Sequence, residues 1–131
     1  MSVRTNSNNN AQPIFGTMAS TPITPRDLKV GEAVYFAYRR AVGIVYETYN
    51  WGLGKQNRPG VSVVLTSGED VGEFSAKEAD QFLVPLGQTG LNYNHQGSAQ
   101  LREDVAAGRF AEAFAKAEHL HREQQIEHQT E

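Results

Sequence analysis

Few residues of this chain combine the type and spacing that metal binding or catalysis needs. His119 and His121 lie two positions apart, and on a helix such side chains point about 200° apart, so they do not share one ion. The run Gly52–Lys55 resembles part of a phosphate-binding loop but lacks the following Ser or Thr and the strand-to-helix context. The chain has no cysteine, which excludes thiolate metal sites and cysteine nucleophiles. We therefore expect no metal, no cofactor and no catalytic residue, and an enzyme would need a site assembled between copies of the chain.

Aromatic side chains are better candidates for a binding surface. The glycine-rich segment Asn50–Gly60 contains Trp51, and a tryptophan beside flexible backbone is commonly a contact residue. The tyrosines before this segment, which include Tyr35 and Tyr38, either join that surface or fill a small core. The predicted partner contacts are Trp51, Tyr49, Tyr46, Phe110 and Phe114.

Four cations form a second candidate surface, namely Arg39, Arg40, Lys55 and Arg58. They interleave with the aromatic residues, and cations beside aromatics suit phosphate contacts combined with base stacking. They equally suit an acidic protein surface. The net charge of −3, with no strongly basic segment, argues against a binder that depends on phosphate neutralisation. Nucleic-acid binding is therefore the alternative to protein binding.

The elements that position these residues are short strands. Between residues 27 and 87, apolar runs alternate with glycine-rich turns, which predicts a small β domain. Ser75 followed by Glu78 has the capping-box pattern, so a single helical turn should precede the last strand. Gly43 indicates a bend or bulge in the second strand. The expected strands are Ala33–Tyr38, Ala41–Tyr49, Val61–Thr66, Val71–Phe74 and Phe82–Leu86.

The chain changes character after Gly87, where residues 88–131 predict a loop and a helical segment with a frayed end. Gly108 interrupts a run of strong helix formers, so one long helix or two short helices should form. Phe110 and Phe114 belong to an apolar stripe that must be buried against the β domain or against a partner, which includes a second copy of the chain. Residues 1–26 are rich in Asn and Pro and predict a disordered or loosely docked arm.

The strand pattern resembles a known fold family. Its motifs are the opening Val30-Gly31-Glu32-Ala33-Val34, the second-strand run Gly43-Ile44-Val45, a hairpin, and the closing Leu83-Val84-Pro85. Together they resemble the SH3-like small β-barrels, including the Tudor and KOW types, over Leu28–Leu86. The resemblance implies a five-stranded barrel and, for the Tudor type, an aromatic cage. It implies no catalytic residue.

These patterns predict a mainly β protein with C-terminal α structure, a five-stranded SH3-like barrel followed by one long or two short helices. No apolar run approaches the roughly 18 residues of a membrane span, and residues 1–10 lack the apolar core of a secretory signal. Without cysteine, we expect a cytoplasmic location. The expected function is a non-catalytic adaptor or regulatory module that binds a protein partner, and a homo-oligomer through the C-terminal helix also fits.

Overall fold

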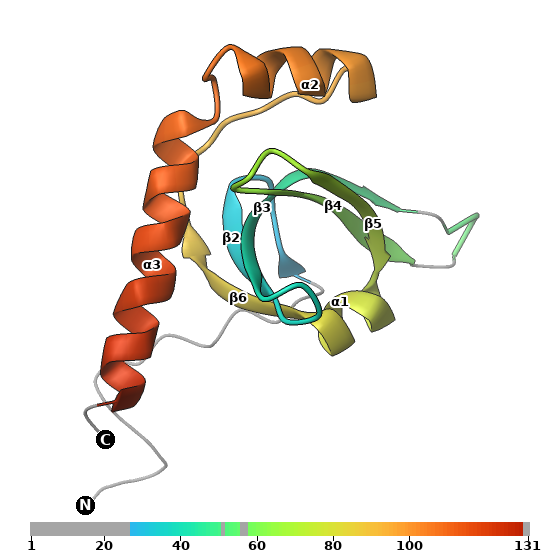
Figure 1. The fold of residues 1–131 in the computed structure, drawn as a ribbon. Coiled ribbons are helices and arrows are strands. Elements are labelled where there is room, and N and C mark those ends of the chain that lie inside the picture. Colours follow the sequence, from blue (N-terminus) through green and yellow to red (C-terminus); the bar gives the residue numbers. More distant parts are fainter. Residues whose placement is uncertain (1–26, 51, 56–57, 130–131) are drawn as a thin grey trace, which may run out of the picture.

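Five strands and three helices make up the described part of the chain. The structure is a computed structural model that describes residues 27–50, 52–55 and 58–129, with side chains as far as Gln125. The predicted N-terminal arm and Trp51 lie outside these residues. In chain order the elements are β2 (Glu32–Phe36), β3 (Ala41–Asn50), β4 (Pro59–Leu65), β5 (Asp70–Ser75), α1 (Ala76–Phe82), β6 (Leu83–Gln88), α2 (Ser98–Ala106) and α3 (Ala111–Gln129) (Figure 1).

The strands form one antiparallel sheet in the order β5-β4-β3-β2-β6. All five predicted strands are present, and their ends differ from the predicted ends by at most two residues. A five-stranded sheet followed by helices is thus confirmed. With α1 preceding β6, the fold is mixed α and β.

The prediction of a closed SH3-like barrel is wrong, because the sheet is open. β5 and β6 are its two edges, and no pairing joins them among the described strands. The connection through α1 explains this result. The Leu83 N–H is taken by the Ala79 carbonyl where α1 ends, and Pro85 has no N–H, so the start of β6 has few donors for a pairing with β5.

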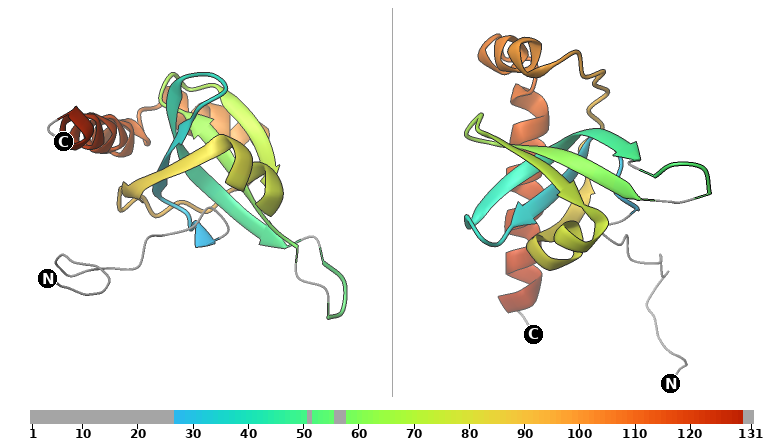
Figure 2. Two further views of the ribbon diagram at one scale, coloured as in Figure 1. Left: turned by 90° about the horizontal axis from the view of Figure 1, so that it is seen from below. Right: turned by 90° about the vertical axis from the view of Figure 1, so that its right-hand side faces the viewer.

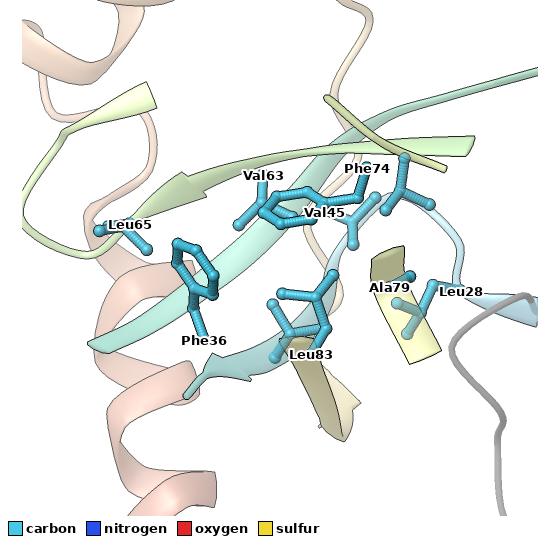
Figure 3. Packing of buried hydrophobic residues seen from close by; sticks show 10 residues of the cluster. Leu28, Phe36, Val45, Val63, Leu65, Phe74, Ala79 and Leu83 are labelled. Carbon is cyan, nitrogen blue, oxygen red and sulfur yellow. The ribbon is translucent and has the colours of Figure 1, made fainter. Parts of the chain in front are cut away.

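The larger core lies on one face of the curved sheet, beside α1 (Figure 3). Alternate residues of each strand point to this face, as the two-residue period of a strand requires. The Phe36 and Phe74 rings meet edge to face at its centre, with centroids 5.3 Å apart. The buried members are Leu28, Val34, Phe36, Val45, Val61, Val63, Leu65, Phe74, Ala79 and Leu83.

The opposite face of the sheet is covered by the C-terminal helices (Figure 2). Ala113 and Ala117 of α3 pack against strand residues that include Ile44. Phe110, in the turn between α2 and α3, packs with Tyr46 and other buried residues. Of the two predicted locations for the apolar stripe, the structure shows burial against the chain's own sheet.

Local sequence signals account for two of the element boundaries. The capping box at α1 is confirmed, since the Ser75 hydroxyl accepts from the Glu78 N–H at 3.2 Å and the Glu78 carboxylate accepts from the Ser75 N–H at 2.9 Å. Gly108 has a φ of 82°, a left-handed conformation that ends the helical run. Two helices therefore form in place of one.

Gly43 has a different role from the predicted bend. The irregularity in the β3–β4 pairing falls between Val45 and Glu47. At Gly43 itself, a Cβ atom would lie 2.7 Å from Val63 Cγ1 and 2.9 Å from the Val64 carbonyl oxygen. Glycine is therefore required because β4 approaches closely.

Candidate functional site

A shallow depression lies between the edge strand β6 and α3. Its volume is about 390 Å³, and its lining residues are Tyr35, Val84, Leu86, His121, Gln124 and Gln125. The Tyr35 and His121 rings stack with centroids 4.7 Å apart and planes 12° apart. Val84, which pairs with Tyr35 across the sheet, remains 47% exposed. The depression therefore combines exposed apolar surface with an aromatic stack and two amide side chains.

The backbone of β6 is protected against pairing with a further strand. Pro85 has no N–H, the Leu83 N–H is bonded to Ala79, and the Gln124 amide donates to the Leu86 carbonyl at 3.5 Å. A partner at this edge must therefore be recognised mainly through the side chains of the depression.

A second concave surface is polar, and it lies along the segment 89–97, here called the strap, and α2. Its volume is about 570 Å³. Asp104 is buried in it, where its carboxylate accepts hydrogen bonds from the Tyr93 hydroxyl at 2.6 Å and from Gln100 at 3.0 Å. It also forms an ion pair with Arg109, whose Nε lies 3.2 Å away. The Tyr93 and Gln100 hydrogen bonds and the Arg109 charge hold the pKa of Asp104 below its usual value. Burial and the Asp104 contact raise the pKa of Tyr93 to about 12, so its hydroxyl stays a donor.

Polar contacts also fix the helices and turns to the sheet. The buried Tyr46 donates its hydroxyl to Asp70 at 2.9 Å, and burial raises the pKa of Tyr46 above its usual value. The Thr66 hydroxyl donates to Glu118 of α3 at 2.6 Å. The first bond joins β3 to β5, and the second adds a directional contact to the apolar packing of α3.

The structure places the predicted aromatic contacts in different environments. Tyr46 and Phe110 are buried within the chain, and Phe114 is half-buried beside them. Tyr49 is half-buried and donates to the Val61 carbonyl at 3.3 Å. Trp51 lies outside the described residues. The described residues of the β3–β4 hairpin project from the body of the molecule (Figures 1 and 2).

The four predicted cations do not form one surface. Arg39 and Arg40 precede β3, whereas Lys55 and Arg58 follow it, and ten extended residues span roughly 30 Å. Arg39 is further engaged in a two-pronged pair with Glu69, at 3.0 and 2.6 Å. Its positive charge is therefore partly neutralised within the chain.

The two helical histidines have separate contacts, as their spacing predicts. His119 lies 3.2 Å from Glu123, one turn along the helix, whereas His121 stacks on Tyr35. Among the residues that the structure describes, no three His, Asp or Glu side chains are grouped as metal ligands would be. Within the same residues, no helix has the length and apolar content needed to cross a bilayer.

Both concave surfaces contain residues that the sequence analysis did not select. Val84 lies in a predicted strand, Tyr93 in a predicted loop and Asp104 in the predicted helical segment. No motif or spacing in the sequence marked them as site residues. A signal was present in the strap, where half-buried Leu91, Tyr93 and His95 alternate with exposed Asn92, Asn94 and Gln96. This two-residue period is typical of an extended segment lying on a surface.

No family model, curated protein or solved structure matches this chain.

Proposed function

We propose that this protein is a non-catalytic interaction module that binds another protein through the depression between β6 and α3. The observation that carries the proposal is the exposed Val84 beside the stacked Tyr35 and His121 rings. Exposed apolar surface next to aromatic side chains is the composition of the energetically important part of a protein interface. The sequence also predicted a contact through the C-terminal helical segment, but through Phe110 and Phe114, whereas the depression uses His121, Gln124 and Gln125.

The shape of the depression favours a protein over a small molecule. Small-molecule sites enclose most of the ligand surface, whereas this depression is shallow and opens along a sheet edge. Because the β6 backbone is largely occupied, the partner should contribute apolar side chains that cover Val84 and the Tyr35 ring. Tyr49 and Trp51 stay a second predicted contact, from the sequence alone.

The arrangement of cations gives nucleic-acid binding less support. The two basic pairs lie at opposite ends of β3, and Arg39 is paired with Glu69. Nucleic-acid affinity grows with the number of phosphates that are neutralised together. Fluorescence anisotropy with single- and double-stranded DNA and RNA, measured over a salt series, should therefore show no tight binding at low salt.

Partner capture with matched variants tests the proposal. The full chain is immobilised and the proteins it retains are quantified by mass spectrometry for the wild type, Val84→Lys and Ser67→Lys. Ser67 is exposed in the turn between β4 and β5, at the sheet edge opposite β6, so the control adds the same charge away from the depression. We expect specific partners that Val84→Lys loses and Ser67→Lys keeps. An identical set from both variants, with circular dichroism showing intact folds, would contradict the proposed surface.

A further inference from the structure

The groove along the strap and α2 is a second concave surface, which the proposed function does not use. Its volume is about 570 Å³, and it is open like the depression at β6, so it suits an extended segment better than an enclosed small molecule. It shares no residue with the depression at β6. Its lining residues are Leu91, Asn92, Tyr93, Asn94, Gln96, Gln100, Asp104 and Arg109.

Asp104 acts within this groove as an anchor for Arg109. Its side chain is only 10% exposed, and its two oxygens accept two hydrogen bonds and form an ion pair with Arg109. The backbone N–H of Arg109 also donates to the Asp104 carbonyl, at 3.0 Å. The carboxylate is therefore engaged, and Arg109 is held by both its side chain and its backbone.

Arg109 remains largely open to solvent. Its ion pair with Asp104 is through Nε, and the side chain is 71% exposed. The two terminal nitrogens of a guanidinium match the two oxygens of a carboxylate in a planar, paired geometry. Asp104 offsets part of the Arg109 charge, so recognition should depend on these paired hydrogen bonds more than on net charge.

The strap supplies the remaining contacts. Asn92, Asn94 and Gln96 are exposed at alternate positions of the strap, and all three line the groove. Each amide carries both donors and an acceptor, which is the complement of a peptide backbone. An anchored arginine in the same groove as these amides therefore matches an extended peptide with an acidic side chain.

We propose that the groove between the strap and α2 binds an acidic peptide segment, with Arg109 holding a carboxylate and the strap amides bonding the peptide backbone. Asp104 is a positioning residue in this site. The groove is independent of the depression at β6, so either site can fail without the other.

Titrations followed by nuclear magnetic resonance test the groove directly. The isotope-labelled full chain is titrated with a tetraglutamate peptide and, separately, with a tetraglutamine peptide of the same length. We expect saturable shifts at Arg109 Nε and at the side-chain amides of Asn92, Asn94 and Gln96 with tetraglutamate, and far smaller shifts with tetraglutamine. Equal shifts with both peptides, or none with either, would overturn the proposal.

Matched substitutions complete the test. Arg109→Gln should weaken tetraglutamate binding by about tenfold or more, because a charge-assisted pair is lost. Arg102→Gln removes a charge from exposed α2 surface outside the groove and should leave binding unchanged. If Arg109→Gln disturbs the fold, Arg109→Lys keeps the charge but not the fork, and should still weaken binding. An equal loss of tetraglutamate affinity in Arg102→Gln would contradict a carboxylate-binding groove. The same resonance shifts produced by inorganic phosphate at equal concentration would also contradict it.

Discussion

Phe110 gives a sharp test of how the C-terminal helices are held to the sheet. It is fully buried, and its ring lies 4.8 Å from Tyr93 and 5.5 Å from Phe114, measured between centroids. Phe110→Ala removes this ring from a cluster that joins both helices to Tyr46 and Val64. Because the cavity can only partly collapse, we expect a loss of about 3–5 kcal/mol in the free energy of unfolding.

That loss is a large part of the roughly 5–15 kcal/mol that stabilises a typical domain. For a domain of this size it corresponds to a fall in Tm of roughly 15–25 °C. Urea denaturation followed by circular dichroism and tryptophan fluorescence gives the free energy and its denaturant slope. The control is Tyr38→Ala, since Tyr38 is 77% exposed and its truncation should cost less than about 1 kcal/mol.

A cost below about 1 kcal/mol for Phe110→Ala would refute the packing described here, because a fully buried ring cannot be removed so cheaply. Phe110 would then be free to contact a partner, as the sequence analysis predicted. An equal cost for Tyr38→Ala would show that stability does not follow burial in this chain.

Three further substitutions test the electrostatics and the close packing. Asp104→Asn should lower the free energy of unfolding at neutral pH. The pKa of Asp104 in the folded chain is below its usual value of 3.8, so its carboxylate stabilises the fold when the pH is above 3.8. That stabilisation is lost as the pH falls through the folded-state pKa. Urea denaturation of both proteins at about pH 7 and below about pH 3 should therefore show a difference that shrinks in acid. Glu32→Gln should stabilise the fold at neutral pH, because burial raises the pKa of Glu32 above 4.5, and the gain should vanish in acid where the carboxyl is protonated in both states. Thermal unfolding over a pH series measures this, and a gain that persists in acid would point to packing instead. Gly43→Ala should cost about 1–3 kcal/mol by urea denaturation, since the added Cβ clashes with Val63, and a neutral effect would show that β4 can move away.

The strands and the first helix were predictable because their signals are local. Apolar runs bounded by glycine-rich turns located all five strands, and the pair Ser75 and Glu78 located α1. Closure of the sheet was not predictable in this way. Closure requires the two edge strands, β5 and β6, to pair. The Leu83 N–H that is bonded to α1 and the missing N–H of Pro85 disfavour this pairing, and the Leu83 contact is known only from the structure.

The candidate sites were harder to predict than the fold. Tyr46 and Phe110 have the composition of a contact surface, but only the packing of α2 and α3 on the sheet determines that they are buried. The contact between Tyr93 and Asp104 joins the strap to a helix, and no spacing in the sequence specifies it. Val84 looks like any core strand residue, and its exposure follows from the edge position of β6.

Crosslinking at Val84 in living cells is the most direct test of a partner in the depression between β6 and α3. A photo-reactive phenylalanine analogue replaces Val84 in one version of the full chain and the exposed Ser67 of the β4–β5 turn in another. After irradiation, we predict a discrete adduct with another protein from the Val84 position and none above background from Ser67. No adduct from Val84, or equal adducts from both positions, would contradict it.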